Sequence, residues 1–264
     1  MAAVSTGGFS PRADSLSSHG PLAQGVVIAI CVATAVSLMF YVQVMRDGLR
    51  VAFGKTHVRA TLGMMAAGTC LFVGLDFLVT RPGAAELYRG ALNFLSGFTT
   101  AGFSVSEVTG HVALLPLILI AMFIGGDIGS TAGGLQVGRF MILARAVQLT
   151  FLRVSVPPTA VTYLRDGATR VAADQMIAVA ALLALYMTTG LTCWIIFLAS
   201  GAPPLPALFE VISAPSTVGL SQGLTGPDMA LHLKLTLMAA MLLGRLEFIA
   251  LIVVLLPQTW MKRN

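Results

Sequence analysis

Long stretches without a charged residue are the feature that most constrains how this chain can fold. A helix needs roughly 20 apolar residues, at about 1.5 Å each, to cross the hydrocarbon core of a bilayer. Three stretches in this chain contain no charged residue: Leu22–Met45, Ala60–Leu75 and Gln175–Phe209. Two further stretches, from Val112 and from Leu235, have the required length but are interrupted by Asp127 and Arg245. We therefore expect an all-α membrane protein with five crossings, in contact with lipid.

The charged residues support this class and orient the chain. Only 10% of the residues are charged, against about 25% in an average soluble domain, and 56% are apolar. The net charge of +5 does not indicate nucleic acid, because the basic residues lie in short loops rather than among aromatic side chains. Lys and Arg are densest after the stretch Leu22–Met45, after the stretch from Val112 and after the stretch from Leu235. These residues are Arg46, Arg50, Lys55, Arg59, Arg145, Arg153, Arg165, Arg170, Lys262 and Arg263. The positive-inside rule then predicts a cytoplasmic C-terminus.

An internal repeat divides the chain into units of outer helix, short helix, glycine loop and inner helix. One unit has its short helix at Tyr88–Phe98 and its loop at Thr99–Ser104. The next has its short helix at Pro206–Ala214 and its loop at Ser216–Ser221. Gly102 and Gly219 are 117 residues apart.

A partial copy of this unit opens the chain. Ser5–Ser10 matches the loop Thr99–Ser104, and the stretch Leu22–Met45 follows as its inner helix. The outer and short helices of this copy are absent, so we expect a chain truncated at its N-terminus. The expected divisions are 1–50, the second half of a pore repeat; 51–155, a complete repeat with a broken inner helix; and 156–264, a complete final repeat.

The geometry of the repeat predicts a cation pathway. Eleven helical residues span about 16 Å, so Tyr88–Phe98 cannot cross a core of about 30 Å and most simply dips in and returns. Irregular backbone at that depth is tolerated where protein buries it or where it lines water. Carbonyl rings can replace the hydration shell of potassium. The expected ion-binding residues are Thr6, Gly7, Gly8, Thr100, Ala101, Gly102, Thr217, Val218 and Gly219.

Two further features interrupt apolar stretches near the inner end of the predicted pathway. Five glycines between Gly125 and Gly134 disfavour a continuous helix and surround Asp127, although small residues can also serve helix packing. Arg245 lies inside the last apolar stretch, where it either faces the pathway, snorkels or pairs, with Asp127 as its expected acceptor. The expected gating residues are Gly125, Gly126, Asp127, Gly129, Gly133, Gly134 and Arg245.

The remaining acidic residues and the potential metal ligands give weaker indications. Asp76, Glu86, Glu107, Glu210 and Asp228 lie toward the outer helix ends, where most are expected to be solvated or to cap helices. The Cys and His residues are scattered without metal-ligand spacing, so no cofactor is expected beyond the potassium ion as transported substrate.

These motifs resemble the Trk/Ktr/HKT superfamily of potassium transporters, specifically its TrkH-type membrane subunits. The glycine loops resemble the second, third and fourth selectivity loops of that family. The run Gly125–Gly134 resembles its broken inner helix, and Met241–Glu247 and Leu256–Trp260 resemble its last helix. Gln136, where a lysine is common, and Asp127, where a small or neutral residue is usual, depart from the pattern.

The resemblance implies potassium uptake across the bacterial inner membrane through four repeats around one pore. It also implies a homodimer and a cytosolic nucleotide-binding regulator of the TrkA type. A secondary transporter with broken helices and a non-conducting fragment or assembly partner are the alternatives. An enzyme is not expected, because no nucleophile–base pair occurs at membrane depth.

Overall fold

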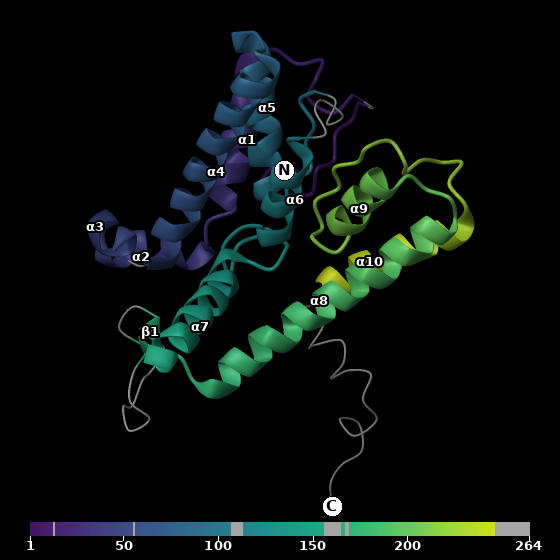
Figure 1. The fold of residues 1–264 in the computed structure, drawn as a ribbon. Coiled ribbons are helices and arrows are strands. Elements are labelled where there is room, and N and C mark those ends of the chain that lie inside the picture. The colour runs from purple at the N-terminus through teal and green to yellow at the C-terminus, as the bar shows by residue number, and fades with distance from the viewer. Residues whose placement is uncertain (13, 55, 107–112, 156–164, 167–168, 246–264) are drawn as a thin grey trace, which may run out of the picture.

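The computed structural model describes residues 1–12, 14–54, 56–106, 113–155, 165–166 and 169–245. Within them the regular secondary structure is helical except for a hairpin of two two-residue strands, and the remaining residues form turns and loops (Figure 1). The helices are α1 (Pro21–Thr34), α2 (Leu38–Asp47), α3 (Leu49–Phe53), α4 (Thr56–Thr80), α5 (Ala84–Phe98), α6 (Leu115–Ile124), α7 (Val137–Ser155), α8 (Ala173–Ala199), α9 (Pro204–Ser213) and α10 (Leu231–Arg245). The strands β1 (Arg165–Asp166) and β2 (Thr169–Arg170) pair antiparallel.

Helices α4 and α8 are the two described helices that are long and apolar enough to cross a membrane alone. The expected straight helix Leu22–Met45 is wrong: it is broken between Thr34 and Leu38, and its halves α1 and α2 are bent by 78°. If that pair counts as one span, the described residues offer three spans. Helix α10 is described up to Arg245, and the expected end of the last helix lies outside the described residues. The number of crossings therefore stays a prediction.

The two short helices of the complete repeats are present with slightly different bounds. Helix α5 begins at Ala84, four residues before the expected start, and the carboxylate of Glu86 accepts a hydrogen bond from the Gly83 N–H at 3.3 Å. Helix α9 begins at Pro204, and proline is well tolerated in the first turn of a helix. At 15 and 10 residues, both helices are shorter than a bilayer core.

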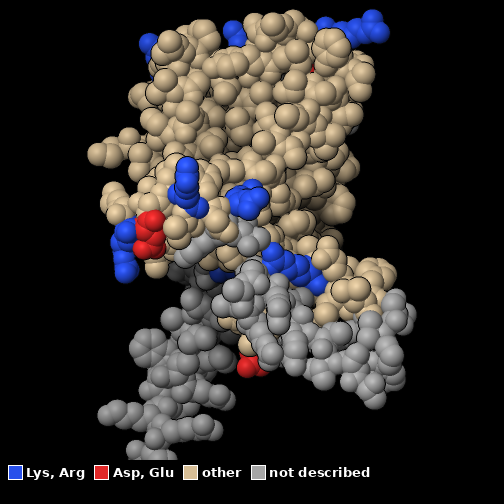
Figure 2. Space-filling view, turned by 90° about the vertical axis from the view of Figure 1, so that its left-hand side faces the viewer, with Lys and Arg blue, Asp and Glu red and all other residues tan. Residues whose placement is uncertain are grey.

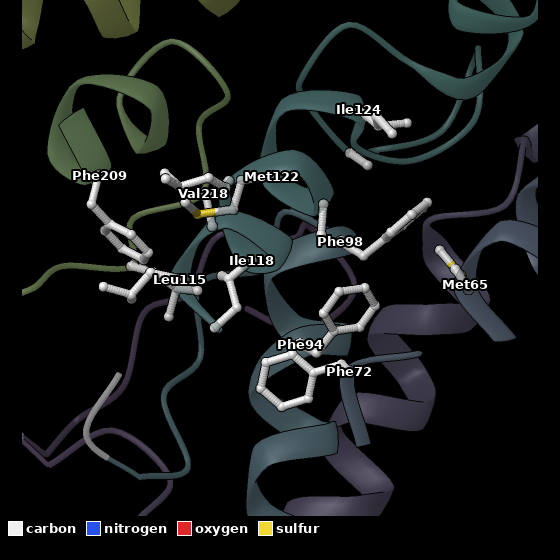
Figure 3. Close-up of a cluster of buried hydrophobic side chains, with 14 of the residues drawn as sticks. Met65, Phe72, Phe94, Phe98, Leu115, Ile118, Met122, Ile124, Phe209 and Val218 are labelled. Atoms are coloured by element: carbon white, nitrogen blue, oxygen red, sulfur yellow. The ribbon is translucent and has the colours of Figure 1, made fainter. Parts of the chain in front are cut away.

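A hydrophobic cluster anchors the short helices to their neighbours (Figure 3). Phe94 and Phe98 of α5 pack with Phe72 of α4, and the rings of Phe72 and Phe94 are 5.4 Å apart. Ile118 and Met122 of α6 extend the cluster toward the last repeat, where Phe209 of α9 and Val218 join it. The ends of α5 and α9 are thereby fixed around a common centre.

The surface divides into a broad uncharged zone and charged ends. In Figure 2, Lys and Arg gather at the top edge and in the lower part of the molecule, with uncharged side chains between them. Large apolar side chains are exposed along the outer helices, including Phe77, Leu78, Ile177 and Ile195. A belt of this kind is what lipid contact requires, and it identifies a multi-pass membrane protein.

Candidate functional site

Three loops adopt the same uncommon backbone conformation. Thr6, Thr100 and Thr217 have φ of 48°, 53° and 54°. Positive φ is a genuine outlier for a β-branched residue, so the surroundings must impose it. Two residues further on, Gly8, Gly102 and Gly219 have φ of 65°, 75° and 83°. The shared Thr-x-Gly geometry supports the repeat as a structural unit that includes the partial copy at the start.

The short helices α5 and α9 hold the loops that follow them with equivalent hydrogen bonds. These loops are Thr99–Ser104, called the third loop below, and Ser216–Ser221, called the fourth loop. The N–H of Ala101 donates to the carbonyl of Ser96 at 3.1 Å. The N–H of Val218 donates to the carbonyl of Ser213 at 3.0 Å. These residues correspond at the 117-residue spacing of the repeat. The C-terminal ends of both helices, which carry partial negative charge, therefore lead directly into the loops, where a cation is favoured.

The loops lie side by side in chain order. A Cβ on Gly8 would meet the carbonyl oxygen of Ala101 at 2.6 Å, and a Cβ on Gly102 would collide with the carbonyl oxygen of Val218. Each glycine is thus required both by its positive φ and by a neighbouring carbonyl. Gly219 is exposed, and within the described part of the chain no heavy atom lies within 4 Å of its Cβ position.

The inner helix of the third repeat is broken, as the glycine density predicted. Helix α6 ends at Ile124 and α7 begins at Val137, and we call the non-helical residues 125–136 the inner loop. Gly125, Gly129 and Gly134 have positive φ, which explains why the turns need glycine. Gln136, at the position noted for its departure from lysine, also has a positive φ, of 72°.

The inner loop lies directly against the three glycine loops. The hydroxyl of Thr6 donates to the carbonyl of Thr131 at 2.7 Å, and the N–H of Gly133 donates to the hydroxyl of Thr100 at 2.7 Å. A Cβ on Gly133 would collide with the hydroxyl of Thr217. The three left-handed threonines therefore all meet the same segment, and they join the loops to it.

The same segment explains the break between α1 and α2. The N–H of Asp127 donates to the carbonyl of Ala35 at 2.9 Å, and the N–H of Leu38 donates to the carbonyl of Gly129 at 3.0 Å. In a continuous helix, Leu38 would instead donate to the carbonyl of Thr34. That carbonyl faces the hydroxyl of Thr131 at 3.4 Å. Hydrogen bonds to a distant segment thus replace helical ones.

Arg245 approaches the inner loop from α10. Its Nη1 lies 3.5 Å from the carbonyl oxygen of Thr131, the same oxygen that accepts the Thr6 hydroxyl. Together with Gln136 and Thr217, Arg245 lines a cavity of about 190 Å³ beneath the loops. Arg245 is exposed within the described residues, which is consistent with a side chain that faces a polar pathway.

The expected ion pair between Arg245 and Asp127 is wrong. Asp127 is only 1% exposed, its Oδ1 accepts the N–H of Ile128 at 2.8 Å, and it borders a different cavity, which Ser37 and His57 also line. His57 acts electrostatically on the Asp127 carboxyl. Arg245 and Asp127 thus line different cavities and make different contacts.

Two buried polar residues behind the loops were not expected from the sequence. Glu210, expected to be solvated or capping, is 4% exposed and accepts hydrogen bonds from Ser221 and Gln222. Asn93 is also 4% exposed and accepts the N–H of Val105 at 2.8 Å. The 117-residue spacing aligns these two residues and could have identified them.

Comparison with known proteins gives a consistent family. The family model described as TrkH, cation transport protein, matches residues 1–262. The chain is 26% identical to the Trk system potassium uptake protein TrkH of Halomonas elongata, over 98% of this chain and 55% of that protein. It is 30% identical to the potassium/sodium uptake protein NtpJ of Enterococcus hirae, over 94% of this chain and 56% of that protein.

A solved structure shares the fold. The crystal structure of the potassium transporter TrkH from Vibrio parahaemolyticus superposes with a TM-score of 0.89 at 22% identity, over 98% of this chain and 57% of that chain. The chain thus spans about half the length of these relatives. With the match of the family model along nearly its whole length, the chain belongs to the TrkH family of cation transport proteins.

Proposed function

We propose that this chain provides three walls of a potassium-selective pathway for potassium uptake. The observation that carries the proposal is the repeated Thr-x-Gly conformation in three loops that pack glycine against carbonyl. Such packing brings backbone carbonyls of different repeats together, and carbonyls are the groups that replace the hydration shell of potassium. The names of the relatives, potassium and potassium/sodium uptake proteins, agree with this choice of ion.

The selectivity residues in this proposal are those expected from the sequence. They are Thr6, Gly7 and Gly8, then Thr100, Ala101 and Gly102, then Thr217, Val218 and Gly219. One further loop, from elsewhere in the native protein or from another chain, closes the ring beside Gly219, whose Cβ position is open in the described residues. The divisions 1–50, 51–155 and 156–264 are then one partial and two complete walls.

The gate in this proposal is the inner loop together with Arg245. Residues Gly125, Gly126, Asp127, Gly129, Gly133 and Gly134 make the segment, and Arg245 places a positive charge at its Thr131 carbonyl. A cation that leaves the loops toward the cytoplasm meets this segment first. Displacing it would break the hydrogen bonds of Thr6 and Thr100 and open the pathway.

The setting and partners of the pathway are also part of the proposal. The distribution of Lys and Arg favours insertion in the bacterial cytoplasmic membrane with a cytoplasmic C-terminus. The family and the Trk system of its relatives favour a homodimer with a TrkA-type nucleotide-binding regulator at the cytoplasmic face.

Ion flux in proteoliposomes tests the proposal. The native protein that contains this chain is expected to carry potassium in preference to sodium. Gly102→Ser is expected to lower that preference by about tenfold or more, because a side chain would collide with the Val218 carbonyl and cannot easily hold positive φ. The control is Gly63→Ser in α4, where a Cβ meets no atom within 4 Å in the described residues. Equal preference in native protein and Gly102→Ser would refute the filter.

A further inference from the structure

In each of the two complete repeats, a buried side chain of the short helix is hydrogen-bonded to the backbone at the outer end of the glycine loop. Asn93 of α5 accepts the N–H of Val105 at 2.8 Å, and Glu210 of α9 accepts the N–H of Gln222 at 2.8 Å. Asn93 and Glu210 are 117 residues apart, as are Val105 and Gln222. The two side chains therefore bind equivalent backbone N–H groups in the segments that follow Gly102 and Gly219. We call each of these segments the exit strand of its loop.

The chemistry at the two positions differs in a way that matches the residue types. The Nδ2 of Asn93 donates to the hydroxyl of Ser106 at 2.8 Å and to its carbonyl at 3.2 Å, so this position needs both a donor and an acceptor. The carboxylate of Glu210 accepts the hydroxyl of Ser221 at 2.6 Å and the N–H of Gln222 at 2.8 Å, both at its Oε1. Two donors therefore converge on one oxygen, and a carboxylate oxygen can accept both.

The fourth loop is held by a second side chain, and the third loop has no equivalent hydrogen bonds in the described residues. The N–H of Gly219 donates to the hydroxyl of Ser213 at 3.1 Å, and that hydroxyl donates to the carbonyl of Leu220 at 2.8 Å. The equivalent hydroxyl, on Ser96, has no hydrogen-bond partner within the described residues. Gly102 is instead supported from the side by the Val218 carbonyl. The fourth loop is thus held mainly from behind, by Glu210 and Ser213.

We propose that Glu210 is a positioning and specificity-determining residue that fixes the exit strand of the fourth loop and holds a negative charge behind it. Asn93 is its uncharged counterpart behind the third loop. The inference rests on the proposed potassium pathway. A fixed negative charge beside a narrow pathway raises the local preference for cations, and a fixed exit strand keeps the carbonyls of Val218 and Gly219 in one orientation.

The test is the ratio of potassium to sodium flux in proteoliposomes that contain the full native protein. Glu210→Gln keeps the size of the side chain but removes its charge, so the hydrogen bonds from Ser221 and Gln222 lose their charge assistance and we expect the ratio to fall by about tenfold, the equivalent of one charge-assisted hydrogen bond. Glu210→Ala is expected to lower it at least as much. Asn93→Asp, which turns an acceptor toward the Ser106 carbonyl, is expected to lower it as well.

The control is Glu86→Gln, which alters a carboxylate at the exposed start of α5 and is expected to leave the ratio unchanged. A purely structural role for Glu210 would lower the melting temperature and both fluxes in proportion while the ratio stays native, and this result would overturn the inference. A native ratio in Glu210→Gln and Glu210→Ala at native stability would also overturn it. Absence of potassium preference in the native protein would overturn the proposed function itself, so the two failures are distinguishable.

Discussion

In the proposed pathway, the three left-handed threonines join the selectivity loops to the gate. Each holds a φ near 50°, which costs of the order of 1–3 kcal/mol for a residue that is not glycine. Thr6 and Thr100 use their hydroxyls to bind the inner loop, and Thr217 touches it at Gly133. Because glycine would hold this conformation without strain, the hydroxyl hydrogen bonds explain why threonine occurs at positions 6 and 100.

Thr100→Val tests this link at the residue scale. Valine keeps the shape of threonine but leaves the Gly133 N–H without its partner, which costs about 1–3 kcal/mol when the group stays buried. We expect a lower melting temperature and a higher basal potassium flux, because the inner loop is held less firmly. Thr100→Ser retains the hydroxyl and serves as the control. Native flux and stability in Thr100→Val would contradict the link.

Among the elements, the inner loop has contacts with almost every part of the pathway. It accepts and donates backbone hydrogen bonds at the break between α1 and α2, it binds two glycine loops, and it meets Arg245 of α10. Breaks in two helices are therefore coupled, since the backbone groups freed in one helix are satisfied by the other. A movement of the inner loop must also change the hydrogen bonds of Ala35 and Leu38.

Arg245→Ala tests the gate at the element scale. Removing the guanidinium takes a positive charge from the exit of the pathway and a contact from the Thr131 carbonyl, so we expect higher potassium flux. Lys234→Ala is the matched control, because Lys234 is a basic residue of the same helix whose Nζ donates to the Pro227 carbonyl instead. Lower flux in Arg245→Ala would reject the barrier.

The separation of Arg245 from Asp127 gives a second prediction for these elements. The two residues line different cavities and do not pair in the described structure, so the effects of Arg245→Ala and Asp127→Asn on flux should add in free-energy terms to within roughly 0.5 kcal/mol. Flux of both single variants and of the double variant supplies the measurement. A large departure from additivity would restore direct coupling.

At the scale of the whole molecule, the glycine loops form an incomplete ring. Gly8 faces the Ala101 carbonyl and Gly102 faces the Val218 carbonyl, while the Cβ position of Gly219 is open in the described residues. A further loop that packed against Gly219 in the same way would bring a carbonyl to that glycine. The walls of a pathway built this way depend on neighbours, because loop backbone exposed to lipid is costly.

Gly102→Ala and Gly219→Ala, compared in two settings, test this arrangement. In the full native protein both are expected to lower the preference for potassium, since one further loop would crowd Gly219 as Val218 crowds Gly102. In these 264 residues expressed alone, we expect no selective potassium flux and no rescue of growth at low potassium in cells without other uptake systems. Selective flux from the 264 residues, or full tolerance of Gly219→Ala in the native protein, would contradict the need for one further loop.

The membrane class, the repeat and the positions of the glycine loops could be predicted from the order of the amino acids alone. Spanning length and charge depend on composition along a single stretch, and the repeat is visible as a 117-residue spacing between Gly102 and Gly219. The break at Gly125–Gly134 was predictable for the same reason, because glycine weakens a helix wherever it occurs. These features depend on local chemistry, which the sequence states directly.

The groups that meet across the repeats could not be predicted without the fold. The stretch around Ala35 contains neither glycine nor proline, and its break arises from hydrogen bonds to the inner loop, about 90 residues away in the chain. In the same way, the buried carboxylate of Glu210 meets two donors of its own repeat, and Asp127 and Arg245 line different cavities. Such contacts depend on how distant segments pack, and hydropathy and spacing carry no information about that packing.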